Sequence, residues 1–313
     1  GIEMVEDNQI KAQVSPFAIR EGEIKTFDGK DGYVSMNQIV HKINIGHITD
    51  IHFAILDLVN EFEFITSRQL YQMLEIKGID PKSQDKLNNK LDALVKSKIL
   101  TRYYFTSDEG KGIYRIYCLE KMGKYLLTSK EVECKWQPSD NTKPVPMIKK
   151  RLAGNQVLIA YLRKVKAFDS YTVKPALTAK TLGKVFKATG GSVKLTKNNK
   201  SIQFLFEAVR REMDWQKKLV EKMNLYKDFY ENFQPGDSGF AGLPQLIFVC
   251  EDEKHMAECF KEIVTNKVEI PQIKLLFTTD LRQNKETLDE TLVEFKLVDG
   301  KYKMEDVELK LLG

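Results

Sequence analysis

Apolar residues recur at helical spacing in three successive stretches in the first third of the chain. The first stretch predicts a helix over about 50–60. The second predicts a helix that is capped by Thr66 or Ser67 and stops at Gly78. The third helix opens near Pro81, because proline is well tolerated in the first turn of a helix. Its apolar stripe lies on one helix face and consists of Leu87, Leu91, Leu94 and Val95.

Two β-rich runs follow the third helix. They cover 101–107 and 113–120, and the glycine-containing segment 108–112 between them is typical of a hairpin loop. A short helix over 122–127 comes next. Three helices followed by a hairpin is the order of a winged helix, in which the second and third helices form a helix-turn-helix and the hairpin is the wing. We therefore expect the third helix to enter the major groove of duplex DNA.

Hydrogen-bonding side chains occupy the outward positions of this third helix. Such side chains suit base edges and phosphates. The candidate DNA-binding residues of the helix are Lys82, Ser83, Gln84, Lys86, Asn89 and Lys90. Those of the wing are Arg102, Tyr104, Lys111 and Arg115. Winged helices also serve as protein–protein modules, and the segment 46–130 has a net charge of only +2, so this alternative stays open.

The second half of the chain alternates between helix-like and strand-like patterns. A helix is expected over 155–166, and β-rich runs over 192–196 and 201–209 flank a turn at 197–200. A long helix is expected over 214–232. The remaining expected elements are a strand at 243–250, a helix at 254–264, a strand at 273–278 and two β-rich tail runs at 292–298 and 307–312. This alternation predicts an α/β sheet covered by helices.

Composition divides the chain into four segments. We expect an N-terminal arm over 1–45, a winged-helix domain over 46–130, a proline-containing polar linker over 131–150 and an α/β domain over 151–313. A wrapped, structured arm is the alternative for the first segment. The fold class expected for the whole chain is α+β.

The net charge of +5 averages over strongly opposed segments. Residues 143–227 hold 20 basic and 5 acidic residues, a surplus of 15, whereas 228–313 hold 10 basic and 18 acidic residues. Such an asymmetry favours a polyanionic partner, most often nucleic acid, although the acidic segment could neutralise the basic one within one fold. The candidate backbone-binding residues of the basic segment are Lys149, Lys150, Arg151, Arg210 and Arg211.

Neither a metal site nor a cofactor site is expected from the sequence. The cysteines, Cys118, Cys134, Cys250 and Cys259, form no C-x-x-C pair, and the histidines, His41, His47, His52 and His255, show no metal-ligand spacing. No P-loop or dinucleotide-binding glycine motif is present. No apolar run approaches the length of a membrane span, and the N-terminus lacks the layout of a signal peptide, so a cytoplasmic protein with reduced cysteines and no membrane partner is expected.

Two groups of hydrophobic patterns resemble the replication-relaxation family of plasmid and conjugative-element proteins. The resemblance covers about 48–265. Its motifs in the first half are Ile65–Leu70, Leu91–Leu100 and Ile113–Tyr117, and those in the second half are Phe204–Val209, Lys218–Tyr230 and Pro244–Val249. The resemblance implies a winged helix followed by a restriction-endonuclease-like domain. It also implies a role in plasmid replication control, maintenance or conjugative transfer.

An active nuclease site of that kind would use an aspartate on one strand, and then an acidic residue and a lysine two positions apart on the next. Such carboxylates hold Mg²⁺, and the metal and lysine stabilise charge on the scissile phosphate. Glu207 stands at the acidic position, but Val209 replaces the lysine, and Asp169 is the only acidic residue over 143–206. We therefore expect a catalytically degenerate domain, in which Glu207 pairs with Arg210, Arg211 or a lysine of the next helix.

The leading hypothesis is a non-catalytic protein that binds double-stranded DNA of a plasmid or mobile element. One alternative is a metal-dependent endonuclease with Glu207 in its site. Another is an adaptor for a relaxase, a replisome or a filament. Replication, segregation or conjugation proteins are further candidate partners, and a homodimer is also an alternative, although no heptad pattern supports one.

Overall fold

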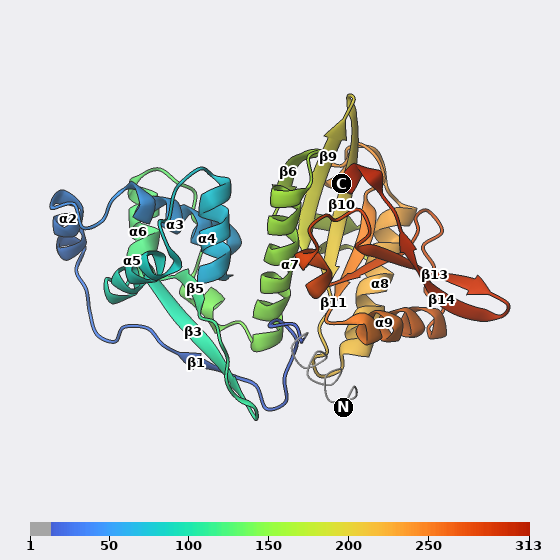
Figure 1. The fold of residues 1–313 in the computed structure, drawn as a ribbon, viewed down its shortest axis with the longest axis horizontal. Coiled ribbons are helices and arrows are strands. Elements are labelled where there is room, and N and C mark those ends of the chain that lie inside the picture. The colour runs from blue at the N-terminus through green and yellow to red at the C-terminus, as the bar shows by residue number, and fades with distance from the viewer. Residues whose placement is uncertain (1–13) are drawn as a thin grey trace. The chain divides into compact units, whose positions relative to one another are not determined.

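The computed structural model describes residues 14–313 and has a mixed α+β fold. The chain divides into two compact units (Figure 1). The smaller unit is Arg20–Leu152, and the larger is Ala153–Gly313 together with residues 14–19. Of the helices within 14–313, none is both long and apolar enough to cross a membrane.

The smaller unit contains the three helices that the apolar spacing predicts. They are α3 (Asp50–Phe62), α4 (Ser67–Ile76) and α5 (Gln84–Lys96), preceded by α2 (Met36–Asn44) and followed by α6 (Lys121–Ser129). Thr66 caps α4, accepting a hydrogen bond from the Gln69 backbone while the Gln69 side chain accepts one from Thr66. Helix α5 begins at Gln84, three residues later than Pro81, because Ser83 provides its N-cap.

A small sheet completes this unit, with strands in the order β1-β3-β5-β2 and β4 paired to β3. Its strands are β1 (Ile24–Phe27), β2 (Ile65–Thr66), β3 (Leu100–Ser107), β4 (Gly110–Lys111) and β5 (Ile116–Leu119). The hairpin expected after α5 is therefore present. Within the arm expected over 1–45, β1 pairs antiparallel with β3 and joins the sheet, so this part of the arm is structured, as the alternative has it. The part of that arm before residue 14 lies outside the described residues.

The polar, proline-containing stretch expected as a linker also packs into the smaller unit. It forms a 3-10 helix, η1 (Pro138–Thr142), and the first turns of α7 (Val145–Lys164). Trp136 is buried and donates to Asn141, whose amide donates to the carbonyl of Leu119 at 2.8 Å. Pro146 lies in the first turn of α7, where proline costs no helical hydrogen bond.

The larger unit is built on a seven-stranded sheet in the order β14-β13-β12-β11-β10-β9-β6, in which β10, β11 and β12 are parallel. The strands are β6 (Phe168–Thr172), β9 (Gly191–Lys197), β10 (Lys200–Ala208), β11 (Gln245–Cys250), β12 (Leu276–Thr279), β13 (Leu292–Val298) and β14 (Lys301–Val307). A two-stranded sheet, β7 (Ala176–Ala179) and β8 (Lys184–Lys187), lies outside it. The short 3-10 helices are η2 (Asp237–Gly239), η3 (Leu281–Asn284) and η4 (Lys310–Leu312).

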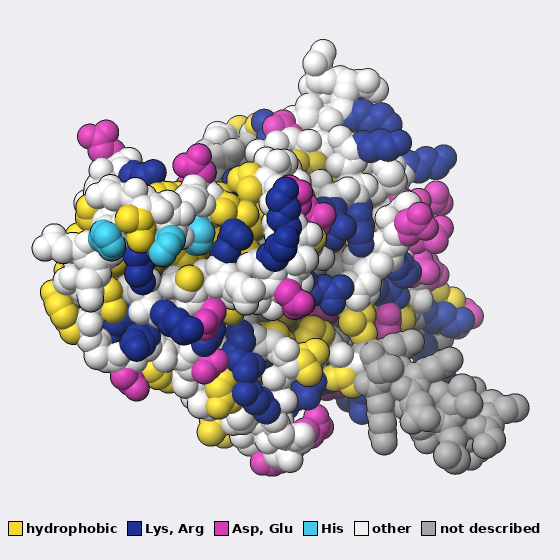
Figure 2. All heavy atoms as spheres, turned by 60° about the vertical axis from the view of Figure 1, so that its left-hand side comes forward, with side chains coloured by type: hydrophobic (Ala, Val, Ile, Leu, Met, Phe, Trp, Pro, Cys, Tyr) yellow, Lys and Arg dark blue, Asp and Glu magenta, His cyan; other side chains and the backbone are white. Residues whose placement is uncertain are grey.

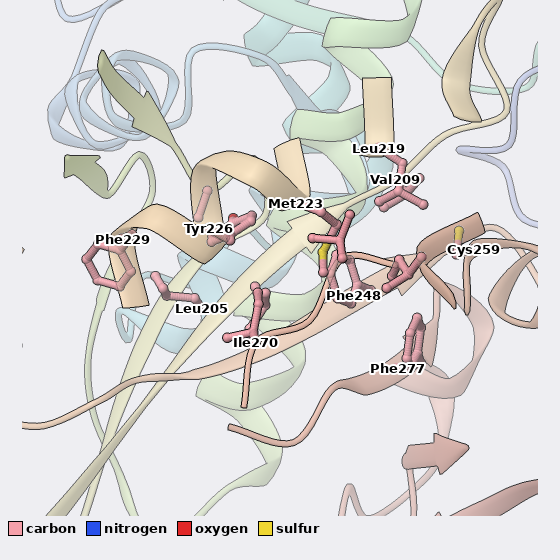
Figure 3. Close-up of a cluster of buried hydrophobic side chains, with 14 of the residues drawn as sticks. Leu205, Val209, Leu219, Met223, Tyr226, Phe229, Phe248, Cys259, Ile270 and Phe277 are labelled. Atoms are coloured by element: carbon pink, nitrogen blue, oxygen red, sulfur yellow. The ribbon is translucent and has the colours of Figure 1, made fainter. Parts of the chain in front are cut away.

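The second half of β10, residues 204–208, is buried on both faces, as its continuous apolar run predicts. Phe204 and Phe206 contact Tyr161 of α7, whereas Leu205 belongs to a core shared with α8 (Trp215–Glu231) and α9 (Glu253–Thr265) (Figure 3). The α/β sheet covered by helices is therefore present.

The second tail strand is placed differently from the prediction. Strand β14 starts at Lys301, because Asp299 and Gly300 both have positive φ angles and form a two-residue hairpin turn. The expected run over 307–312 instead ends in η4. The apolar residues of 307–312 favour a strand there, but the turn at Asp299 and Gly300 sets the pairing of β14 with β13.

Candidate nucleic-acid interface

Helix α5 separates an apolar face from a polar one. Its predicted stripe is buried, whereas Lys86 and Asn89 are exposed and Lys90 is half-buried. Ser83 accepts from the Lys86 backbone at 3.1 Å, so its hydroxyl belongs to the helix cap. Gln84 donates to Asn88 of the next turn at 3.0 Å. The helix therefore presents lysine and amide groups along one polar face.

Lys82 lies just before α5, in a left-handed backbone conformation with φ of 69°. Its backbone N–H donates to Asp80 at 2.8 Å, and its ammonium group lies 3.3 Å from the same carboxylate. Hydrogen bonds from Lys82 lower the pKa of Asp80. Both side chains are about two-thirds exposed, so this pair is held at the surface.

The two wing arginines are bound within the unit instead of being presented at its surface. Asp28, which directly follows β1, lies 3.1 Å from Arg102 Nε and 2.9 Å from Arg115 Nε. Arg102 also pairs with Asp92 of α5 at 3.2 Å. Lys111 is the exposed cation of the wing, and its ammonium group stands 4.3 Å from the ring centre of Tyr104. Arg102 and Arg115 therefore fasten the wing to β1.

The basic cluster at 149–151 is largely buried, since it lies on α7 and not on a linker. Lys149 is 1% exposed and forms an ion pair with Glu23 at 2.6 Å. Arg151 is buried as well, and this burial lowers its pKa to about 10. Lys150 is half-buried. Lys149 and Arg151 are therefore not placed to contact a DNA backbone.

Arg210 and Arg211 lie at the carboxyl ends of the parallel strands and form ion pairs there. Arg210 is fully buried and donates to both oxygens of Asp280, at 2.6 and 2.9 Å. Arg211 donates to both oxygens of Asp252 and to Glu258 at 2.9 Å. Both guanidinium groups are therefore bound to carboxylates of the same unit instead of being free to bind phosphate.

Glu207 is buried, and its carboxylate has hydrogen-bond and ion-pair partners. Its carboxylate accepts from the hydroxyls of Tyr226 at 2.5 Å and Thr189 at 2.8 Å, and Lys222 of α8 lies 3.4 Å away. Of the three pairings predicted for Glu207, the structure contains the one with a lysine of the following helix, Lys222. Asp169 lies elsewhere, accepting from Thr196 at 2.7 Å.

Sequence reasoning missed one cluster of metal-ligating side chains, and among residues 14–313 it is the only group of at least three. It consists of Cys250, His255 and Cys259, all buried, with their candidate ligand atoms within 4.8 Å of one another. The signal was the spacing of His255 and Cys259, which places them one turn apart on α9.

The ring nitrogens of His255 make this cluster a poor metal site as it stands. Nδ1 accepts the backbone N–H of Glu251 at 3.0 Å. In the neutral ring the proton then resides on Nε2, so neither nitrogen offers a free lone pair. The Trp215 ring packs edge-to-face against the His255 ring, with 4.8 Å between the ring centres. The cluster is therefore part of the hydrophobic core of the larger unit.

The buried His255 is expected to make the larger unit less stable in acid. Burial lowers its pKa from 6.5 to about 3, so the unfolded chain takes up a proton below about pH 6.5 that the native state excludes. Stability is therefore lost as the pH falls from about 6.5 to about 3. Between pH 7.5 and pH 4.5 the free energy of unfolding is expected to fall by about 2–3 kcal/mol.

Urea unfolding at several pH values measures this effect. His255→Gln should flatten the pH dependence by that amount. Parallel pH dependences in the native protein and the variant would contradict the assignment.

Four exposed cations of the basic segment lie on strands of the larger unit. Lys184 and Lys187 are exposed on β8, and Lys197 and Lys200 are exposed where β9 turns into β10. Lysine and arginine side chains gather near the end of the larger unit that is uppermost in Figure 2, where Figure 1 shows the β9–β10 hairpin. The basic surplus of the sequence is therefore exposed here more than at 149–151 or 210–211.

These features define an α+β protein of two units. The exposed polar face of α5 belongs to the smaller unit, and the basic strands β8, β9 and β10 belong to the larger one. The chain belongs to the replication-relaxation family, whose family model matches residues 56–243. The matched region starts within α3 and ends just before β11. Comparison with the curated proteins and with the solved structures gives no match.

Proposed function

We propose that this protein binds double-stranded DNA without cutting it, in the replication control, maintenance or transfer of a plasmid or mobile element. The family membership supports the biological setting. The observation that carries DNA binding is the polar face of α5, where Lys86 and Asn89 are exposed above a buried apolar stripe. Lysine and asparagine are side chains that recognise phosphates and base edges.

The smaller unit acts in this proposal as a winged helix. The order α3, α4, α5 and the β3–β5 hairpin supports it, with α5 as the helix that reads the major groove. Lys111 at the wing contacts the DNA backbone. Because Asp28 and Asp92 hold Arg102, that arginine positions the wing instead of binding phosphate.

The larger unit acts as a degenerate restriction-endonuclease-like domain. The run α7, β6, β9, β10, α8, β11 supports this fold. The environment of Glu207 supports the loss of catalysis, since Tyr226 and Lys222 occupy its carboxylate and Val209 stands where a lysine would be needed. A cleavage site would require carboxylates free to hold Mg²⁺.

An electrophoretic shift assay on DNA of the protein's own genetic element tests the proposal. Binding should weaken by about 1,000-fold or more between about 50 and 200 mM salt, because each phosphate contact releases counterions. In the same assay with Mg²⁺, supercoiled plasmid should stay uncut. A missing shift at the lowest salt would overturn DNA binding, and cleavage that disappears in Glu207→Gln would overturn the non-catalytic assignment.

A further inference from the structure

The β9–β10 hairpin extends beyond the sheet to which it belongs (Figure 1). Strand β10 begins at Lys200 but pairs with β11 only from Phe204 onward. On the other side, the pairing of β9 with β6 ends at Leu195. Thr196 still donates its backbone N–H to the Ala167 carbonyl at 2.8 Å. The outer part of the hairpin, 197–201, is therefore a free-standing two-stranded ribbon among the described residues.

The turn at the end of this ribbon is fixed by its backbone. Asn198 and Asn199 have φ angles of 53° and 62°, and Lys197 pairs with Lys200 across them. Two central residues with positive φ form the hairpin turn that matches the natural twist of the strands. The backbone of the ribbon tip is thus preorganised, which lowers the entropic cost of binding.

The charges at this tip oppose the stability of the isolated protein. Lys197 and Lys200 lie directly opposite each other, and like charges in that position destabilise a strand pair. Both are exposed, and neither has an ion-pair partner among the residues that the structure describes. A polyanion placed between or beside them would convert this repulsion into attraction.

The second face of the ribbon is neutral and polar. Thr196 and Ser201 lie opposite each other with their hydroxyls 3.1 Å apart, and Thr196 donates to Asp169. Lys194 lies further down this face, 3.9 Å from the same carboxylate. Positive charge is therefore concentrated at the tip, beside the two asparagine amides.

We propose that the ribbon tip, 197–200, is a second DNA-contacting element that enters the major groove of the duplex. This inference rests on the proposed DNA-binding function. A two-stranded ribbon fits the roughly 12 Å width of that groove. Lys197 and Lys200 contact phosphates, and the amides of Asn198 and Asn199 lie toward the groove floor.

The double variant Lys197→Gln/Lys200→Gln tests this element in the full-length protein. At about 100 mM salt, the apparent Kd for duplex DNA should rise at least about 10-fold. The salt slope should fall by about 2, since each lost phosphate contact removes about 0.9. The loss should be similar for all duplex sequences, and the melting temperature should be unchanged or higher because the lysine repulsion is gone.

The matched control is Lys301→Gln/Lys303→Gln, which removes two exposed lysines beside the other two-residue turn of the same sheet. Its Kd and salt slope should remain those of the native protein. If the native protein binds DNA and the ribbon variant keeps its Kd and slope, the ribbon is not a DNA element, while the proposed function stands. If the native protein itself binds no DNA, both fail, and an acidic protein surface becomes the partner to test.

Discussion

Replacing Asp280 by alanine is expected to lower the free energy of unfolding of the larger unit by about 3–5 kcal/mol. Arg210, its partner, is fully buried and donates two hydrogen bonds to this carboxylate. Removing the carboxylate would leave a charged guanidinium in the core without the counterion to which it is hydrogen-bonded. The cost of an uncompensated buried charge exceeds that of a lost apolar contact.

The location of the pair makes this effect large. Arg210 follows β10 and Asp280 follows β12, and Arg210 also donates to the Val249 carbonyl of β11 at 3.1 Å. The pair therefore ties together the carboxyl ends of three parallel strands. The N-terminal segment joins them, since Ser15 donates to Asp280 and the Phe17 carbonyl accepts from Arg210 at 3.1 Å. Burial raises the pKa of Glu251 beside this group. Loss of Asp280 should therefore loosen several elements together.

Urea unfolding followed by tryptophan fluorescence measures the change. Trp215 lies in the larger unit and Trp136 in the smaller, so a Trp136→Phe background reports the larger unit alone. Asp306→Ala is the control, because Asp306 is exposed and pairs with Arg282 at 3.4 Å, and its removal should cost less than about 1 kcal/mol.

A second variant separates the buried charge from general damage to the fold. Arg210→Met combined with Asp280→Ala should be more stable than Asp280→Ala alone, because no charge remains unpaired. A loss below about 1 kcal/mol in the single variant would contradict the assigned role of the pair.

The elements with strong local patterns could be predicted from the sequence, and those fixed by distant pairing could not. The apolar stripe of α5 and the continuous run of β10 determine their burial directly. Strand β1 is four residues long and shows no clean alternation, so only its pairing with β3 defines it. The prolines at 138–146 were typical of a linker, but they start η1 and α7 instead.

The residues of the candidate site were harder to predict from the sequence than the elements of the fold. The basic surplus over 143–227 is a property of the sequence, but the sequence does not indicate which cations face solvent. Lys149 pairs with Glu23 and Arg210 with Asp280, over separations of 126 and 70 residues. Ion pairs of this range leave no local signal. The β9–β10 tip is different, because its lysines are separated by a two-residue turn and remain at the surface.

Alanine substitution of Lys86 and Asn89 on α5 is expected to lower both the affinity and the sequence preference of DNA binding. A good contact between a side chain and a base contributes about 1–3 kcal/mol of discrimination. Alanine favours helix, and both side chains are exposed, so α5 should stay folded. The ribbon variant, in contrast, removes phosphate contacts and should weaken binding to every duplex equally.

A competition shift assay distinguishes these two effects, using the preferred site located by footprinting and a scrambled duplex of equal length. The α5 variant should lose about 10-fold or more on the preferred site and clearly less on the scrambled one. Lys217→Ala/Asn224→Ala, an exposed lysine and asparagine on α8, is the matched control and should keep the preference ratio. Equal losses on both duplexes would show that α5 contacts only the DNA backbone. The proposal that α5 recognises the DNA sequence would then be wrong.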